Sequence, residues 1–181
     1  LQGLVDRHES LRTTFVAEGG SLKQVVHAEH AVDLEVEAPP DPGTAETGGQ
    51  LAESLEAEAH HAFDLAAGPL FRARLIRLDA AEHVMVLNMH HIVSDGWSHD
   101  VLERDLGELY DAAVTHRPAH LPELPIQYAD YACWQADWLA SGELGRQLEF
   151  WREELNGAPL LLALPLDQPR EKPLHQILRR M

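Results

Sequence analysis

Two histidines, an aspartate and a glycine stand close together after an apolar run in the middle of the chain. His90 and His91 follow residues 83–89 (HVMVLNM), which the pattern predicts to be a buried strand, and Asp95 and Gly96 come shortly after them. A histidine can take up a proton near neutral pH, because its unperturbed pKa is about 6.5. Acyl transfer to an amine or hydroxyl needs a base for that proton, or a group that stabilises the developing charge. The segment can therefore support a catalytic histidine.

Strand geometry limits how the two histidines can act together. Successive side chains of a strand point to opposite faces, so we expect one histidine to face the packed interior and the other a cleft. A metal site on His90, His91 and Asp95 would need these side chains to converge, and no Cys or Glu-x-x-His companion supports it. We therefore predict one working histidine and no metal. On the residues alone, a structural histidine and a catalytic base are about equally good interpretations.

The residues after the histidines can build the surroundings of such a site. Asp95 can fix the site through an ion pair with an arginine, or it can orient the imidazole directly. Gly96 lets the backbone approach closely and offers its N–H as a donor. A helix predicted over residues 98–116, with Ser98 as its N-cap, adds free amides and a dipole that favours negative charge. The motifs of two other catalytic classes, G-x-S-x-G and a phosphate-binding glycine loop, are absent from the sequence.

Composition excludes several classes of function. Acidic residues outnumber basic ones 30 to 14 in 181 residues, and the net charge of −16 disfavours binding to nucleic acid or to anionic membranes. No signal peptide or membrane-length apolar stretch is visible, so we expect a cytoplasmic protein. The single cysteine, Cys133, fits a reducing compartment, and its neighbours Ala132 and Trp134 predict a buried, inert thiol.

The remaining pattern predicts a mixed α/β fold that carries this segment. Residues 71–78 alternate apolar side chains with arginine, which indicates a strand with one wet face, and they form an antiparallel hairpin with residues 83–89. The pair His60-His61 falls on a predicted amphipathic helix and is expected to be partly exposed. The other predicted elements are a hairpin of 11–16 with 22–27, a strand at 34–37, an exposed loop at 39–50, and helices at 51–63, 127–140 and 142–156.

Four stretches, in this order, resemble the motifs of condensation domains from non-ribosomal peptide synthetases. Residues 7–15 (RHESLRTTF) resemble RHExLRTxF, and residues 63–73 (FDLAAGPLFRA) resemble FDLxxGPLxRA. Residues 90–96 (HHIVSDG) resemble HHxxxDG, and residues 128–135 (YADYACWQ) resemble YxDYAxWQ. The HHxxxDG motif alone would leave carnitine- and chloramphenicol-type acyltransferases equally open, but the ordered set is specific.

The resemblance implies a fold and an activity. The family fold has two chloramphenicol-acetyltransferase-like lobes in a V with a tunnel between them, and this chain would be one lobe, a mixed, largely antiparallel sheet packed by helices. The implied reaction is amide-bond formation between two thioesters held on the phosphopantetheine arms of aminoacyl and peptidyl carrier domains. The domain itself would bind no cofactor. Its partners would be the carrier domains, an adenylation domain and the missing C-terminal lobe.

The resemblance also implies roles for individual residues. His91 matches the catalytic histidine, as general base on the acceptor amine or as stabiliser of the tetrahedral intermediate. Gly96 matches a position whose amide lines the reaction centre. His90 and Asp95 match structural members of the motif. The other site-supporting positions are arginines, one of which is expected to pair with Asp95: Arg7 and Arg12.

The same resemblance predicts the extent of the domain. Residues 1–170 would form the N-terminal lobe, with the family's first motif upstream of Leu1, and residues 171–181 would be an atypical tail. Tyr128, Tyr131 and Trp134 are expected to pack in a helix core. We expect the fragment alone to be inactive, because the tunnel needs both lobes. Two alternatives stay open, a non-catalytic docking or recruitment module of the same fold and a relative of epimerisation domains, whereas His90-His91 argues against a cyclisation domain.

Overall fold

The computed structural model describes residues 1–37 and 45–159 of the chain, which divides into two compact units, residues 1–136 and 137–181. The proposed lobe boundary at residue 170 and the tail at 171–181 lie outside the described residues. None of the described helices is both long enough and apolar enough to cross a bilayer. The histidine segment belongs to the first unit, which holds all the strands described below.

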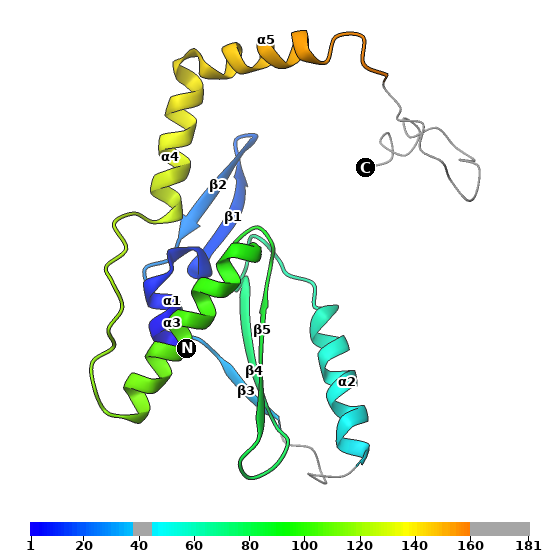
Figure 1. Ribbon diagram of the computed structural model, residues 1–181, viewed down its shortest axis with the longest axis vertical. Helices are drawn as coiled ribbons and strands as arrows, with labels where there is room; N and C mark the ends of the chain where they lie inside the picture. Colours follow the sequence, from blue (N-terminus) through cyan, green and yellow to red (C-terminus); the bar gives the residue numbers. More distant parts are fainter. Residues whose placement is uncertain (38–44, 160–181) are drawn as a thin grey trace, which may run out of the picture. The chain divides into compact units, whose positions relative to one another are not determined.

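A three-stranded sheet forms the centre of the first unit (Figure 1). Its strands are β3 (Leu34–Glu37), β4 (Phe71–Arg77) and β5 (His83–Met89), in that order across the sheet. β4 pairs antiparallel with β5, as predicted, and parallel with β3. A separate antiparallel hairpin consists of β1 (Thr13–Glu18) and β2 (Ser21–Val26) and confirms the predicted hairpin, with its first strand two residues later than expected. The sheet is therefore mixed and largely antiparallel.

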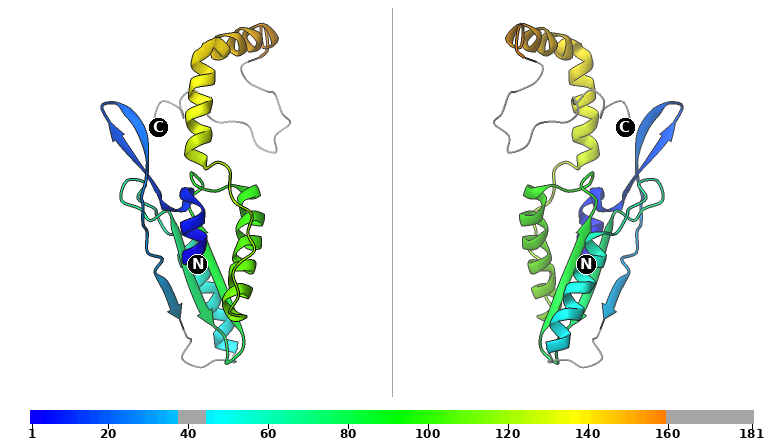
Figure 2. Two further views of the ribbon diagram at one scale, coloured as in Figure 1. Left: turned by 90° about the vertical axis from the view of Figure 1, so that its left-hand side faces the viewer. Right: turned by 90° about the vertical axis from the view of Figure 1, so that its right-hand side faces the viewer.

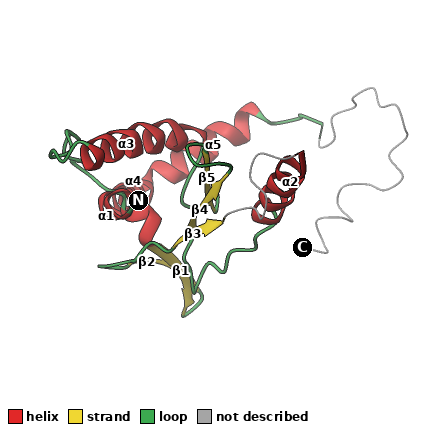
Figure 3. Cartoon of the chain, turned by 90° about the horizontal axis from the view of Figure 1, so that it is seen from below, coloured by secondary structure: helices red, strands yellow, loops and turns green. Residues whose placement is uncertain are grey.

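Helices cover both faces of the central sheet, as Figures 2 and 3 show. On one face lie α1 (Gln2–Arg7), the 3-10 turn η1 (Glu9–Arg12) and the long helix α3 (Gly96–Val114). Between them and the sheet is an apolar core of Leu4, Val5, Leu11, Phe71, Ala73 and Leu102. On the other face α2 (Ala45–Ala59) lies against β5. This layered arrangement holds the end of β5, and hence the histidine segment, at the start of α3.

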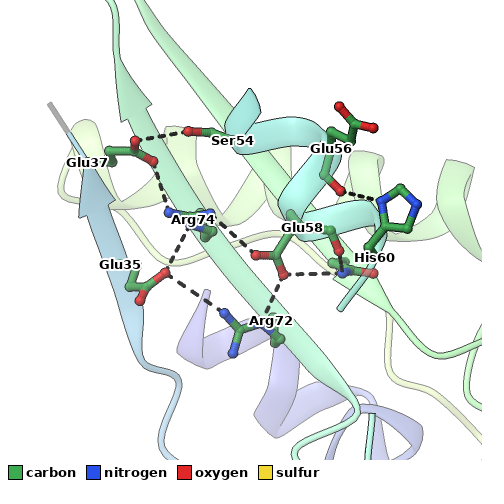
Figure 4. A network of polar contacts seen from close by, with 9 residues as sticks. Glu35, Glu37, Ser54, Glu56, Glu58, His60, Arg72 and Arg74 are labelled. Carbon is green, nitrogen blue, oxygen red and sulfur yellow. Dashed lines mark hydrogen bonds and ion pairs between the residues drawn. The ribbon is translucent and has the colours of Figure 1, made fainter. Parts of the chain in front are cut away.

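The prediction that β4 has one wet face is wrong. Arg72 and Arg74 lie beneath α2 and are partly buried, where they supply donors to Glu58 of α2, whose surface is only 5% exposed (Figure 4). Arg72 Nε donates to Glu58 Oε1 across 2.9 Å, and Asn88 Nδ2 donates to the Glu58 carbonyl oxygen across 2.6 Å. Arg74 Nη2 donates to Glu37 Oε2 of β3 across 2.9 Å. This polar layer joins α2 to the sheet.

The predicted boundaries around α2 need correction. Residues 45–50 are helical rather than a loop, and residues 39–44 of the predicted loop lie outside the described part of the chain. The pattern failed because Gly48 and Gly49 suggest a turn, although Ala45, Glu46 and Gln50 are good helix formers. The helix ends at Ala59, so His60 and His61 follow it rather than lie on it, and both are exposed as predicted.

The two last predicted helices are confirmed as α4 (Tyr128–Trp138) and α5 (Leu144–Glu154), with a π turn between them over Leu139–Glu143. The prediction that the aromatic residues of α4 fill a core is wrong. Tyr128, Tyr131 and Trp134 are 56%, 40% and 57% exposed, and their helical spacing places the rings against one another, with centroids 6.0 and 5.6 Å apart. Cys133 of the same helix is also exposed, so the expected buried thiol is wrong too.

Candidate functional site

His90 and His91 lie in a turn that follows β5, not in the strand itself. β5 ends at Met89, and a hydrogen bond from Val93 N to His90 O, 3.0 Å long, closes the turn. Strand alternation therefore does not extend to the two histidines. The division expected from it nevertheless exists, because His90 is half-buried and His91 is exposed.

Three neighbours hold His90, two of them through its ring and one through its backbone. Its Nδ1 accepts a hydrogen bond from Ile92 N across 3.0 Å, and its backbone N–H donates to Leu70 O across 3.0 Å. The ring of Phe63 meets it edge-on, at a centroid distance of 6.1 Å and an interplanar angle of 89°. Because a backbone N–H points at Nδ1, that nitrogen must carry the lone pair, and the neutral ring carries its proton on Nε2. His90 therefore has a structural place in the turn.

Asp95 caps the helix that begins directly after the turn. Its Oδ1 accepts hydrogen bonds from Ser98 N at 2.9 Å and from Ser98 Oγ at 2.7 Å, while Ser98 Oγ accepts from Asp95 N at 3.1 Å. This reciprocal capping box makes Asp95 the N-cap, so the predicted start of the helix at Ser98 is two residues late. The hydrogen bonds from Ser98 lower the pKa of Asp95, and the nearby His91 adds a smaller effect in the same direction.

The expected ion pair between Asp95 and an arginine is wrong for the described residues. Arg7 Nε instead donates to Asp105 Oδ2 across 2.9 Å. Arg12 Nη2 donates to Glu9 Oε1 across 3.3 Å, and Arg12 also contacts the carbonyl oxygen of His27. The Asp95 carboxylate is instead engaged by the capping box, through Oδ1.

Asp105 is a supporting residue that the sequence interpretation missed. Its side chain is fully buried and accepts hydrogen bonds from Arg7, from His8 Nε2 at 3.0 Å and from Arg104 Nη2 at 2.8 Å. Burial by itself would raise the pKa of Asp105, but these hydrogen bonds outweigh it and the pKa is lowered. A signal was present in the sequence, since Asp105 falls three residues after Leu102 on the apolar face of the helix.

His91 lines a hollow of about 250 Å³ within the first unit. The walls come from the turn of residues 91–95, from η1, from the β1–β2 hairpin and from the start of α4. Besides apolar residues, the lining includes several polar and titratable side chains: Glu9, Ser10, Thr13, Gln24, Ser94, Asp95, Ser98 and Tyr128. An exposed imidazole in such a hollow can accept a proton or donate a hydrogen bond to a bound molecule. Gly96 follows Asp95, and a Cβ there would meet no atom within 4 Å.

The structure thus brings His91 and Asp95 to one hollow, which Arg7, Arg12 and Gly96 do not line. Among residues 1–37 and 45–159 no group of three or more His, Cys, Asp or Glu side chains could hold a metal ion. His90 faces Phe63 and does not line the hollow. The arrangement suits proton transfer or charge stabilisation by one imidazole.

Comparison with known proteins gives a consistent result. The family model described as "Condensation domain" matches residues 1–178. One of the linear gramicidin synthase proteins of Brevibacillus parabrevis is 46% identical over 175 residues, which cover 94% of this chain and 3% of that protein. The X-domain in complex with OxyB from teicoplanin biosynthesis superposes with a TM-score of 0.79 at 32% identity, over 93% of this chain and 36% of that one.

A second solved structure, the epimerization domain from the third module of tyrocidine synthetase B, has a TM-score of 0.75 at 25% identity, over 94% of this chain and 38% of that one. The chain therefore spans just over a third of both solved structures. It spans only a small part of the gramicidin synthase protein.

Proposed function

Since this chain belongs to the condensation-domain family, we propose that it contributes the histidine side of a site that forms an amide bond between two thioester-bound substrates. In this reaction the acceptor amine attacks the thioester carbonyl of the donor. A C–N bond forms, the C–S bond breaks, and the amine proton leaves as the thiolate becomes a thiol. Donor and acceptor would be aminoacyl or peptidyl groups, as in the synthetases that the chain resembles.

The exposed imidazole of His91 is the observation that carries the proposal. It lines the hollow together with Asp95, whereas His90 commits Nδ1 to the backbone of Ile92. His91 would take the proton of the attacking amine, or would stabilise the charge of the tetrahedral intermediate. Gly96, in the first turn of α3, would offer its own backbone N–H to the developing negative charge.

The partners of this site follow from the proposed reaction. Both substrates would arrive on the phosphopantetheine arms of carrier domains loaded by adenylation domains. The remaining part of the domain would complete the path for the two arms. We propose no cofactor bound by this chain, because the amine, the thioester and one imidazole are sufficient for the chemistry.

Two other functions of the same fold compete with this one. The structure of the X-domain in complex with OxyB favours a docking module, since that neighbour is 32% identical to this chain. The epimerization domain favours inversion of a stereocentre, although its identity is only 25%. A condensation domain joins two substrates, an epimerisation domain inverts one, and a docking module binds without turnover.

One experiment separates the three. The full-length protein that carries this chain is given a donor and an acceptor carrier, each loaded by its own adenylation domain, and the carrier-bound products are released and analysed by chiral mass spectrometry. We expect a dipeptide in the presence of both carriers and none after His91→Ala. An inverted single residue would replace the proposal by epimerisation. Carrier binding without any product would replace it by docking.

A further inference from the structure

The side chain of Gln127 bridges two parts of the chain that are far apart in sequence. Its Nε2 donates a hydrogen bond to Arg7 O across 3.0 Å, and its Oε1 accepts one from Glu9 N across 3.2 Å. Both contacts are partly buried. They satisfy two backbone groups, the carbonyl of Arg7 and the N–H of Glu9, that water reaches poorly. The residue between them, His8, has an extended backbone, with φ −104° and ψ 98°. One amide group thus satisfies the carbonyl before His8 and the N–H after it.

Both sides of this bridge adjoin the hollow that contains His91. Glu9 and Ser10 line the hollow from η1, and Tyr128 and Ala129 line it from the start of α4. Gln127 immediately precedes Tyr128, and its side chain holds the backbone of Glu9. Its own N–H donates to Asp130 Oδ2 across 2.8 Å, which fixes the first turn of α4. One residue therefore sets the spacing of two walls, whereas His91 comes from a third segment.

Only a side chain with one donor and one acceptor at its end can make this bridge. The Gln127 amide must place its nitrogen toward Arg7 O and its oxygen toward Glu9 N. A leucine of similar size offers neither group. A glutamate in its carboxylate form can still accept from Glu9 N–H but has no proton for Arg7 O, whereas a protonated glutamic acid has both. Loss of the bridge can thus be distinguished from loss of packing, because only the bridge depends on the protonation state of a glutamate at this position.

We propose that Gln127 is a positioning residue of the His91 site, which sets the width of the hollow between η1 and α4 and thereby the affinity for the bound substrate. This inference rests on the proposed function, because the substrate of the hollow is taken to be a carrier-bound acyl or amine group. His91 itself does not depend on the bridge. Loss of Gln127 should therefore weaken binding and leave the chemical step intact.

The chain offers a matched control in Gln2. Its amide makes the same two-sided contact, donating from Nε2 to His30 O at 2.9 Å and accepting at Oε1 from Val32 N at 3.1 Å. Gln2 does not line the hollow of His91. Replacing Gln2 by leucine removes a bridge of the same kind at a more exposed place on the unit, away from the hollow.

The test compares Gln127→Leu, Gln127→Glu, Gln2→Leu and His91→Ala in the full-length protein. The rate of dipeptide formation is measured against the concentration of a separately expressed acceptor carrier, loaded with the amino acid that its own adenylation domain activates. We expect Gln127→Leu to raise KM roughly tenfold with kcat within about twofold of the parent, which corresponds to the loss of a bridging contact rather than of a catalytic group. We expect Gln2→Leu to leave both constants unchanged.

Gln127→Glu supplies the readout that a merely structural role would not move. Its KM relative to the parent should fall as the pH is lowered from about 6.5 to about 4, because protonation of the new carboxylate, whose ordinary pKa is about 4.3, restores the missing donor. An unchanged KM in Gln127→Leu, a loss confined to kcat, or a pH-independent KM in Gln127→Glu would overturn the inference. Full activity in His91→Ala would instead overturn the proposed function, so the two failures are distinguishable.

Discussion

Arg7 Nε donates a hydrogen bond to Asp105 Oδ2 across 2.9 Å and so joins α1 to the middle of α3. The Asp105 side chain is completely buried, and it also accepts hydrogen bonds from His8 and Arg104. A buried carboxylate is tolerated only where donors and positive charges replace its lost hydration. The contact therefore fixes α3 against α1, and α3 is the helix that begins directly after the turn of His90 and His91.

Replacing Asp105 by Asn should be strongly destabilising. The amide removes the negative charge and turns a donor group toward Arg7 or His8, so we expect the free energy of unfolding to fall by about 3 kcal/mol. Urea denaturation followed by circular dichroism measures this change. Asp100→Asn, at an exposed position of the same helix, should change it by less than about 0.5 kcal/mol. Equal losses in the two variants would show that the buried contact does not stabilise the fold.

The capping box predicts different outcomes for two replacements of Asp95. Asp95→Ala removes the acceptor for Ser98 N and Ser98 Oγ and should cost about 1 kcal/mol of stability. Asp95→Asn keeps a side-chain oxygen at the N-cap and should stay within about 0.5 kcal/mol of the parent. Thermal unfolding of the two variants checks this. An equal loss of stability in Asp95→Asn and Asp95→Ala would show that the negative charge, and not the capping hydrogen bond, stabilises the helix.

Glu58 predicts how stability depends on pH. The hydrogen bond from Arg72 lowers the pKa of Glu58, and its burial opposes this less strongly. The unfolded chain therefore binds a proton more readily than the folded one. The stabilisation is fully present above the ordinary glutamate pKa of about 4.3 and is lost as the pH falls through the lowered value.

Glu58→Gln should accordingly flatten the loss of stability in acid. We expect the difference in unfolding free energy between about pH 7 and about pH 3.5 to be smaller in Glu58→Gln than in the parent. Glu56→Gln, an exposed neighbour on α2, should retain the parental dependence. Urea titrations at the two pH values measure all three proteins. Parallel curves for Glu58→Gln and the parent would contradict the assignment.

The turn predicts the tautomer of His90. Because Ile92 N donates to Nδ1, the neutral imidazole should carry its proton on Nε2. Long-range ¹H–¹⁵N correlation of the histidine rings, with His90→Gln to assign the signal, distinguishes the two nitrogens by their chemical shifts. A protonated Nδ1 at a pH where the ring is neutral would mean that the turn is closed in some other way.

Local patterns in the sequence predicted most of the fold. Alternation located β4 and β5, and apolar spacing located α3, because these elements bury their own periodic faces. Side-chain contacts between elements far apart in the sequence could not be predicted from such local patterns. The arginines of β4 were taken as solvent-facing, since nothing in residues 71–78 reveals that Glu58 of another helix lies over them.

In the site, too, local features were easier to predict than contacts between distant residues. Strand alternation was expected to separate the two histidines; they lie in a turn instead, but the difference between them is present as a half-buried His90 and an exposed His91. The partner of Asp95 was wrong because a capping box is local, with Ser98 only three residues away, while an arginine pair was inferred from the family. Gln127 was missed because its partners are 118 and 120 residues distant in sequence.

The role of His91 is the central claim, and a single-turnover measurement tests it most directly. The full-length protein, its His91→Ala variant and an exposed-histidine control on α3, His99→Ala, are mixed with loaded donor and acceptor carriers and quenched at short times. We predict that His91→Ala slows amide-bond formation by at least about 100-fold while its melting temperature matches the parent, because the side chain is exposed. His99→Ala should react at the parental rate. A parental rate in His91→Ala would contradict the account.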